Sequence, residues 1–519
     1  MGLNLAHYLD VAAAEFGGKT AVMWHDRRMS YTELATAAKK VATVIAERGI
    51  KEGDKVAVMV PNIPEFLMIY YGILRAGAVV VSLNFLLKSH EIEYHLEDSE
   101  AKLLFAWAGL DREFAVAFEA TDTCHDVVLV DTPQHAATAG DYQALSPLMA
   151  RATAAVDTVE TMPNDTAVIL YTSGTTGHPK GAELTHFNMF FNALCVRERV
   201  LKIRSEDVCL VVLPLFHSFG QTCQLNAAVL AGATMTMMDA FDARKMVEII
   251  KRDRVTFMAA VPSIYRMMAN MKHLDKADLG SLRTCVSGGD ALPGALLDEF
   301  AQRFGIDLIE GYGLTETSPV ASFNIVGRPG VANSIGPAIW GCEMKIMRQD
   351  QTFADVDEIG EIVIRGPNVM KGYYNRPAAT EEAFTDGWLH TGDLGKVNQN
   401  GYFFVVDRKK DMLIRNGLNV YPREVEEVLD SHPAVLEAAV VGIPDPLRGE
   451  EVKAYVALRA GKQTTEKELI AYCRERLAPY KYPRQIEFRA ALPKGPTGKI
   501  LKRQLRTTHV PDDARGPAS

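Results

Sequence analysis

Short apolar runs alternate with helix-forming patterns through the first 160 residues of the chain. Ser30-Tyr-Thr-Glu33 has the form of a capping box, and the apolar residues after it recur at helical spacing until Gly49. The run Val56–Val60 follows as a short strand that ends at Pro61. Alternation of this kind is typical of an α/β fold in which helices wrap a parallel or mixed sheet. Further buried strands are predicted at Leu103–Phe105, Val127–Val130, Val208–Val212, Thr234–Met238 and Thr256–Ala260.

The pattern changes at about Ile335, where short strands and tight turns replace the alternation. Glu361–Ile364 and Tyr402–Val406 are strand-like, and Asp386-Gly387 and Asn400-Gly401 are turn signals. These features predict a small β-barrel-like subdomain that completes a large N-terminal domain over residues 1–406.

A run of five charged residues, Asp407-Arg-Lys-Lys-Asp411, then interrupts the apolar pattern. Five adjacent charges are unsuited to joint burial, so we expect residues 407–411 to connect two domains as a hinge. Residues 412–506 are predicted to form a small, mobile α+β domain in which Pro422 starts a helix. The polar tail, residues 507–519, is expected to be disordered.

Composition excludes some functions. The net charge of −9 argues against a nucleic-acid-binding protein, so any phosphate site must come from local basic residues and backbone donors. The seven cysteines are scattered and contain no C-x-x-C pair, which favours reduced thiols in a cytoplasmic protein over a zinc site or a disulfide framework. We expect no secretory signal, and the apolar stretch Phe66–Leu83, broken by Arg75 and Gly77, is interpreted as a buried helix and strand. Peripheral contact with a membrane stays open.

One loop carries a clear chemical signal. The segment Tyr171-Thr-Ser-Gly-Thr-Thr-Gly-His-Pro-Lys180-Gly181 follows the apolar run Ala167–Leu170 and contains little side-chain bulk. Glycine lets the backbone approach a ligand closely, so N–H groups, hydroxyls and one lysine can surround a polyphosphate. The segment is not a Walker loop, because Gly181 follows Lys180 where Ser or Thr should stand. A flexible polar surface loop is the alternative.

Further segments, in order along the chain, resemble the core motifs of the acyl-adenylate-forming (AMP-binding) superfamily, and most closely those of bacterial medium- and long-chain fatty acyl-CoA synthetases. The resemblance extends from about Thr32 to Arg506. The segments are the loop above, Leu213-Pro-Leu-Phe-His217-Ser-Phe-Gly220, Gly311-Tyr-Gly-Leu-Thr-Glu316-Thr, Trp388-Leu-His-Thr-Gly-Asp393, Asp407-Arg-Lys-Lys-Asp-Met-Leu-Ile-Arg-Asn-Gly417 and Pro493-Lys-Gly-Pro-Thr-Gly-Lys499.

The resemblance implies a ligase that joins a carboxylic acid to coenzyme A through an acyl-adenylate, releasing AMP and pyrophosphate. Its substrates would be ATP, the acid and coenzyme A, with Mg²⁺ as cofactor and a monomer or homodimer as the assembly. The implied β- and γ-phosphate site comprises Thr172, Ser173, Gly174, Thr175, Thr176, Gly177 and Lys180.

The same resemblance assigns the rest of the nucleotide site. Thr315 would bond the α-phosphate, while Glu316 and Thr172 would hold Mg²⁺. Tyr312, between Gly311 and Gly313, would lie against adenine beside Gly289 and Asp290, and Asp393 would accept the ribose hydroxyls with help from Arg408. Taken singly, Tyr312 also suits a core aromatic residue and Asp393 a turn.

Lys499 is expected to bridge the acyl carboxylate and the α-phosphate as a point charge. Without the surrounding motif it would be interpreted as an ordinary solvated lysine. Thiol attack then requires Lys499 to withdraw, so the resemblance implies a rotation of the C-terminal domain about Lys410. Gly417 and Asn419 would lie beside the adenylate or the pantetheine tunnel after that rotation.

The acid site is predicted to be apolar. His217 would line it and swing to admit substrate, although a packed histidine is the alternative. The wall is expected to include Phe216, Phe219, Leu225, Val320 and Trp340. No lysine or arginine lies between Val211 and Phe241, which disfavours a dicarboxylic acid.

Gln221 stands where some long-chain synthetases carry a gating tryptophan, so medium-chain and aromatic acids, such as those of cinnamate-type ligases, stay open. Two further alternatives are an acyl-AMP ligase that loads a carrier protein and a binding module without activity. The run Trp388–Arg408 lacks the insertion expected of the former, and the charged residues that the chemistry requires disfavour the latter.

Overall fold

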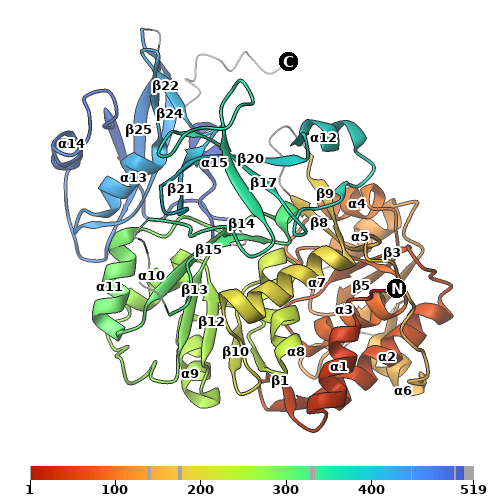
Figure 1. Ribbon diagram of the computed structural model, residues 1–519. Helices are drawn as coiled ribbons and strands as arrows, with labels where there is room; N and C mark the ends of the chain where they lie inside the picture. The colour runs from red at the N-terminus through yellow and green to blue at the C-terminus, as the bar shows by residue number, and fades with distance from the viewer. Residues whose placement is uncertain are drawn as a thin grey trace, which may run out of the picture.

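The protein is described from a computed structural model that covers residues 2–110, 113–136, 142–172, 178–327, 331, 333–445, 447–495 and 498–507. Within these residues the strands form two eight-stranded sheets and two five-stranded sheets. Figure 1 shows the large sheets with their helices in the red-to-green part of the chain, and the blue C-terminal unit above β14 and β15. The predicted α/β architecture with a small C-terminal domain is confirmed.

The first large sheet has a parallel centre, as the alternation of helices and strands predicted. Only β9 and β18, at one edge, run antiparallel to their neighbours. Its order is β18 (Gly372–Tyr373), β9 (Lys180–Thr185), β8 (Thr166–Thr172), β4 (Val79–Ser82), β3 (Lys55–Met59), β5 (Ala101–Trp107), β6 (Asp126–Val130) and β7 (Gln143–Ala144).

The second large sheet is built in the same way, with antiparallel strands at its two edges. Its order is β15 (Val320–Phe323), β14 (Leu308–Gly313), β13 (Thr284–Ser287), β12 (Phe257–Ala260), β10 (Val208–Val211), β11 (Thr234–Met237), β1 (Thr20–Trp24) and β2 (Arg27–Ser30).

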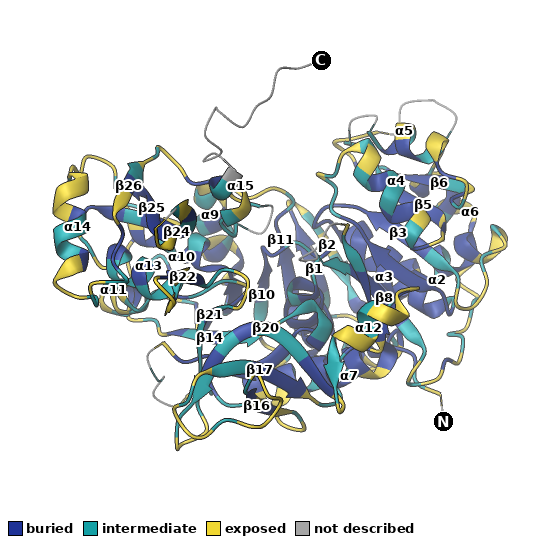
Figure 2. Ribbon diagram, turned by 90° about the horizontal axis from the view of Figure 1, so that it is seen from above, coloured by how far each residue is buried: buried dark blue, intermediate teal, exposed yellow. Residues whose placement is uncertain are grey.

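Helices pack on and between these sheets. They are α1 (His7–Phe16), α2 (Tyr31–Glu47), α3 (Pro64–Arg75), α4 (Ser89–Asp98), α5 (Glu113–Ala120), α6 (Leu145–Arg151), α7 (His186–Cys195), α8 (Ala227–Ala231), α9 (Ala243–Asp253), α10 (Pro262–Asn270) and α11 (Gly294–Phe304), with the π-helical turns η1 (Val196–Val200) and η2 (Gly220–Asn226) and the 3₁₀ turn η3 (Thr315–Thr317). One core cluster joins both sheets, and Figure 2 shows their strands as the most buried part of the molecule.

Local signals explain individual elements. The predicted capping box forms at the start of α2, where Ser30 Oγ accepts the Glu33 N–H at 3.2 Å and the Glu33 carboxylate accepts the Ser30 N–H at 2.7 Å. The apolar stretch Phe66–Leu83 contains most of α3, which is buried over its full length, and β4. Among the described residues, no helix is both long enough and apolar enough to cross a membrane.

The two small sheets follow in sequence. The third sheet is antiparallel and contains β16 (Glu343–Met347), β17 (Gly360–Arg365), β20 (Trp388–Val397), β19 (Phe384–Thr385) and β21 (Phe403–Arg408), with α12 (Pro377–Glu382) before β19. The fourth contains β23 (Leu418–Val420), β22 (Leu413–Arg415), β25 (Gly449–Leu458), β24 (Val435–Asp445) and β26 (Gln485–Phe488), with α13 (Pro422–Asp430), α14 (Glu466–Arg474) and α15 (Lys502–Thr507).

The charged run 407–411 spans the passage between the third and fourth sheets, because β21 ends at Arg408 and β22 begins at Leu413. One of its charges is buried: Asp407 is 5% exposed and accepts the N–H of Arg423 at 2.8 Å. Burial raises the pKa of the Asp407 carboxyl, with Lys502 acting in the opposite direction. The segment is therefore anchored at one end, while Lys409 and Lys410 are exposed.

Candidate active site

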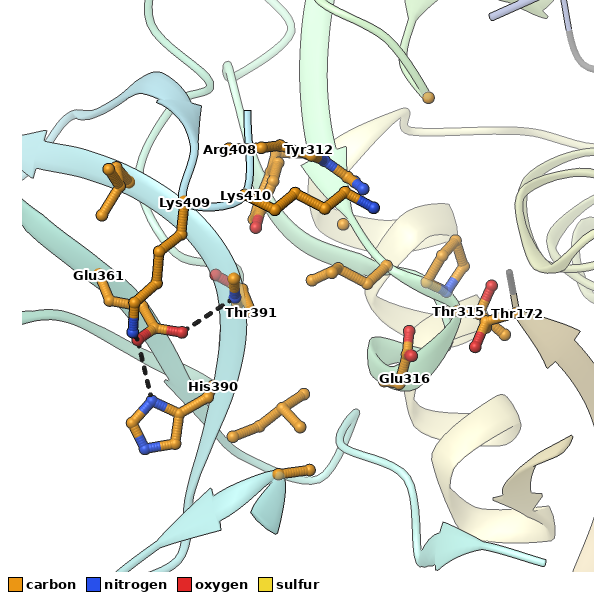
Figure 3. Close-up of a pocket in the computed structure, with 18 of the residues that line it drawn as sticks. Thr172, Tyr312, Thr315, Glu316, Glu361, His390, Thr391, Arg408, Lys409 and Lys410 are labelled. Atoms are coloured by element: carbon orange, nitrogen blue, oxygen red, sulfur yellow. Dashed lines mark hydrogen bonds and ion pairs between the residues drawn. The ribbon is translucent and has the colours of Figure 1, made fainter. Parts of the chain in front are cut away.

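A cavity of about 1180 Å³ lies where the carboxyl end of β8, the end of β14, the strand β20 and the start of the fourth sheet meet. Most of the predicted site residues line it, although they come from distant parts of the sequence (Figure 3). These residues are Thr172, Lys180, His217, Gly289, Gly311, Tyr312, Gly313, Thr315, Glu316, Arg408, Lys410 and Asn419. The cavity thus joins segments separated by almost 250 positions.

Other predicted residues lie elsewhere. Ser173, Gly174, Thr175, Thr176 and Gly177 fall outside the described residues. Asp290, Asp393, Gly417 and Lys499 are not among the lining residues of the cavity. Asp393 and Lys499 are nevertheless tied to it by the contacts described below, whereas Gly417 takes the left-handed turn position (φ 76°) between β22 and β23.

Tyr312, Asp393 and Arg408 form one connected group. The Tyr312 hydroxyl donates to Asp393 Oδ2 at 2.6 Å, and Arg408 Nε lies 3.1 Å from Asp393 Oδ1. Asp393 is 3% exposed. Burial of the Tyr312 hydroxyl is the larger cause, and the neighbouring Asp393 carboxylate the next, that raises the pKa of Tyr312. Each carboxylate oxygen can accept more than one hydrogen bond, so Asp393 keeps acceptor capacity for a ligand hydroxyl.

Thr172, Thr315 and Glu316 lie to one side of Tyr312 and Arg408 in the cavity (Figure 3), and Lys180 is a further lining residue. Thr172 and Lys180 are register partners at the end of the β8–β9 pair where the chain passes from one strand to the other. Tyr373 connects two charged residues here: its hydroxyl donates to Glu316 Oε1 at 2.9 Å, and the Lys180 ammonium lies 5.1 Å from its ring centroid. The carboxylate of Glu316 and the hydroxyl of Thr172 are hard oxygen donors, which fit a Mg²⁺ ion that takes its other ligands from water and phosphate.

A second polar group was missed by sequence reasoning. The Glu361 carboxylate accepts the N–H of Gly392 at 3.0 Å, and its Oε2 lies 3.2 Å from both His390 Nδ1 and Lys409 Nζ (Figure 3). Gly392 has φ 70° and its carbonyl accepts the N–H of Lys409 at 2.9 Å. Glu361 therefore connects Gly392, the residue before Asp393, to Lys409 of the charged run 407–411.

The sequence offered a partial signal for this group. His390 stands inside the motif Trp388–Asp393, and Lys409 inside the charged run. Glu361 and Tyr373 had no such signal, because each reaches the site only through strand pairing: Glu361 pairs with Leu394 across β17 and β20, and Tyr373 with Ala182 across β18 and β9.

Lys499 is not a lining residue, but it lies close enough to Arg408 and Lys410, which line the cavity, for their charges to act on it. It is half-buried, and burial, Arg408 and Lys410 lower the pKa of its ammonium group against the opposing effect of Asp290 and Asp393. The preceding residue, Gly498, has φ 81° and approaches α10 so closely that a Cβ would lie 2.7 Å from Ser263 Oγ. A glycine is therefore required for the Lys499 loop to sit in this place.

Polar contacts hold the C-terminal unit in this orientation. Arg266 of α10 pairs with Asp430 of α13 at 3.1 Å, and both side chains are largely buried. Arg459 donates to Asn270 Oδ1 at 3.0 Å. The side chain of Lys410, an exposed residue on the same side of the cavity, points into it in Figure 3. Partial burial of its ammonium group and the nearby charge of Arg408 lower its pKa.

Part of the remaining wall is apolar and includes Phe219, Val320 and Phe323, with His217 two residues before Phe219. Burial lowers the pKa of His217 to about 4, so its imidazole is neutral near pH 7. The expectation that Trp340 lines this wall is wrong: it is 62% exposed and stacks on Phe191 at 5.8 Å, next to a separate small pocket. Phe216 and Leu225 are buried but are not lining residues either.

Comparisons with known proteins agree with this geometry. Residues 9–374 match the family model of AMP-binding enzymes, and residues 424–499 match that of the AMP-binding enzyme C-terminal domain. A long-chain-fatty-acid–CoA ligase of Bacillus subtilis is 37% identical over 535 residues, covering 97% of this chain and 94% of the relative. A feruloyl-CoA synthase of Amycolatopsis is 38% identical and covers 94% and 95%. The crystal structure of ATP-bound MatB from Rhodopseudomonas palustris superposes with a TM-score of 0.90 at 32% identity, over 98% of this chain and 99% of that one.

Proposed function

The chain belongs to the AMP-binding enzyme family, and we propose that it is an ATP-dependent ligase that converts a carboxylic acid and coenzyme A to acyl-CoA, AMP and pyrophosphate. One observation carries the proposal: Thr172, Lys180 and Glu316 line one cavity together with Arg408 and Lys410, whose charges also act on the ammonium group of Lys499. A cation of the C-terminal unit, Lys499, thus lies near a cavity that is also lined by Thr172 and Lys180 of the first large sheet, the proposed phosphate-binding residues.

In the first half-reaction, an oxygen of the acid attacks the α-phosphorus of ATP, the bond to the bridging oxygen breaks, and pyrophosphate leaves. Two anions must approach each other, so fixed cations and donors are needed where the charge develops. Lys180, Thr172 and residues 173–177 would hold the β- and γ-phosphates, Thr315 the α-phosphate, and Lys499 would bridge the two reactants. A Mg²⁺ ion held by Glu316 and Thr172 would neutralise phosphate charge.

The rest of the nucleotide would lie at the Tyr312 end of the cavity. Adenine would pack on the Tyr312 ring beside Gly289 and Asp290, between Gly311 and Gly313. Asp393 would accept the ribose hydroxyls while Arg408 and Tyr312 hold its carboxylate in place.

In the second half-reaction, the thiol of coenzyme A loses its proton, its sulfur attacks the acyl carbon, and AMP leaves. We propose that residues 412–506 turn as a lid on the domain of residues 1–406, about the hinge 407–411, and withdraw Lys499. Lys410 would take up the change in backbone angles, and Gly417 and Asn419 would enter the site. His217, which is neutral near pH 7, would border the acyl group without adding a charge beside it.

For the acid, we propose a medium- to long-chain fatty acid, supported by the apolar wall and by the long-chain-fatty-acid–CoA ligase relative. A cinnamate-type aromatic acid is the second candidate, because the feruloyl-CoA synthase relative is equally similar. Loading of a carrier protein is less favoured: β20 and β21 are joined by a short turn, with Asn398 N–H bonded to the Tyr402 carbonyl at 3.0 Å, and no insertion intervenes.

Pyrophosphate and thioester release test the proposal. Purified protein should release pyrophosphate only when an acid, ATP and Mg²⁺ are all present, and should form thioester only when coenzyme A is added. Pyrophosphate release without any thioester, at saturating coenzyme A, would instead point to carrier loading. A screen of straight-chain acids of increasing length, with cinnamate and benzoate, would identify the acid.

A further inference from the structure

Helix α10 turns one face toward the C-terminal unit, and Figures 1 and 2 both show the two next to each other. The opposite face is buried in the core and includes Tyr265 and Met268, whereas Ser263, Arg266 and Asn270 are half-buried or exposed. Residues three and seven positions apart lie on one side of an α-helix. We call Ser263, Arg266 and Asn270 the docking face of α10.

Arg266, in the middle of the docking face, forms an ion pair with the C-terminal unit. Its Nη2 lies 3.1 Å from Oδ2 of Asp430, the last residue of α13, and the two side chains are only 15% and 12% exposed. Separation of the two units would return both charges to water, which offsets part of their attraction. Removal of Arg266 alone would instead leave Asp430 unpaired in the docked arrangement, which is much less favourable.

Asn270 provides a second contact at the end of the docking face. Its Nδ2 donates to the Arg266 carbonyl at 2.8 Å, and its Oδ1 accepts from Arg459 Nη1 at 3.0 Å. Arg459 follows β25, and its Nε donates to the Val435 carbonyl at 3.0 Å, so this guanidinium is fixed within the C-terminal unit. Glu299 of α11 lies 3.7 Å from its Nη2. Two helices of the large domain therefore hold one side chain of the smaller one.

The first turn of α10 meets the loop that carries Lys499. A Cβ at Gly498 would lie 2.7 Å from Ser263 Oγ. The loop is fixed to its own domain, because the Gly495 N–H donates to the Lys499 carbonyl at 2.8 Å and Ile500 packs against a core cluster of the C-terminal unit. The position of that unit on α10 therefore determines the position of Lys499.

We propose that Arg266 is a positioning residue that selects the orientation for acid activation. By pairing with Asp430 it docks the C-terminal unit on α10, and Val261, which immediately precedes this helix, lines the cavity. The contacts of the docking face join the two domains that are proposed to turn, so they must break before thioester formation. Loss of the Arg266 pair therefore slows the first half-reaction and spares the second. This inference rests on the proposed ligase function and adds a residue that controls its two orientations.

Arg266→Met tests the inference, because methionine keeps an unbranched apolar side chain and removes the charge. We expect the single-turnover rate of pyrophosphate release to fall by about tenfold or more, since Asp430 is left unpaired in the docked orientation. Transfer from synthetic acyl-adenylate to coenzyme A should stay within about twofold of the wild-type rate, or rise. The acid is whichever of decanoate, hexadecanoate, cinnamate and benzoate the wild-type protein activates fastest. A merely structural role would lower both rates together.

Arg283→Met is the matched control. Arg283 pairs with Asp207 at 2.8 Å within the large domain, so its loss removes an ion pair without touching the docking face, and the ratio of the two rates should stay at the wild-type value. Arg266→Met combined with Asp430→Asn leaves no unpaired charge and should recover the activation rate by at least about threefold over Arg266→Met alone.

A third comparison uses Lys499→Ala as the background. If Arg266 acts through Lys499, adding Arg266→Met to Lys499→Ala should lower the remaining activation rate by less than about twofold. A full tenfold further loss would mean that the two residues act independently.

That independence, equal loss of both half-reactions in Arg266→Met, or an unchanged activation rate overturns the inference. If Arg266→Met fails to fold, Asn270→Ala at the exposed end of α10 decides by the same two rates, with an expected loss of about threefold in activation alone. Failure of the wild-type protein to release pyrophosphate with any of the four acids would instead contradict the ligase proposal itself.

Discussion

The hydroxyl of Tyr312 and the carboxylate of Asp393 are joined by a hydrogen bond of 2.6 Å, so two residues 81 positions apart act as one unit. Tyr312→Phe keeps the ring but removes this bond. We expect KM for ATP to rise about three- to tenfold, in line with the ~1 kcal/mol net contribution of one hydrogen bond. Initial rates at varied ATP check this, and an unchanged KM would show that Arg408 alone positions Asp393.

Lys499→Ala should slow acid activation by at least about 100-fold, as expected when a group that stabilises developing charge is lost. The variant should still transfer the acyl group from presynthesised acyl-adenylate to coenzyme A. Lys494→Ala is the matched control, because Lys494 lies in the same loop region and pairs with Glu437. Activation by Lys499→Ala at the wild-type rate would remove the basis of the proposed mechanism.

Lys410→Pro fixes one backbone angle in the connecting segment. We expect acyl-adenylate formation to continue and thioester formation to slow by at least about tenfold, since the lid can no longer turn. Lys409→Ala is the control that leaves the backbone free. Separate measurement of pyrophosphate release and thioester yield distinguishes the steps, and equal loss of both would argue against a hinge at Lys410.

The Glu361 contacts divide into a buried and an exposed part. Glu361→Ala removes the acceptor of the Gly392 N–H as well as the Lys409 pair, whereas Lys409→Ala removes only an exposed ion pair worth about 0–1 kcal/mol. KM for ATP should therefore rise clearly in Glu361→Ala and change less than about fivefold in Lys409→Ala. Similar effects of both substitutions would mean that the ion pair, not the Gly392 contact, supports the nucleotide site.

Glu310 gives a pH-dependent prediction. Burial raises its pKa from 4.5 to about 7, with Arg423 opposing the shift. The folded protein therefore binds one more proton than the unfolded chain between these values, and this group's contribution to stability falls as pH rises from 4.5 through 7. Glu310→Gln keeps an acceptor for the Leu292 N–H and should raise the melting temperature more at pH 8 than at pH 5. A larger gain at pH 5 would contradict the assignment.

Local patterns predicted the fold well where neighbouring residues determine the structure. The capping box at Ser30, the turns at Asp386-Gly387 and Asn400-Gly401, and the helix start at Pro422 all appear in the structure. The ordered motifs also identified residues that converge on the cavity, such as Thr172 and Glu316.

The site residues that the sequence did not predict are those positioned by pairing between strands that are distant in the chain. Glu361 and Tyr373 enter the site through strands whose partners lie far away in the chain, and a charge or a phenol on a strand has no periodic signal of its own. The prediction for Trp340 was wrong because its position in the sequence, relative to the motifs, does not show that its ring faces the solvent.

The close seat of Gly498 against Ser263 has a consequence for biosynthesis. The lining residues of the cavity all lie at or before Tyr421, whereas Lys499 follows much later in the chain. Every lining residue of the cavity therefore leaves the ribosome before Lys499, and a chain that ends short of position 499 would carry those residues without the cation proposed for acid activation.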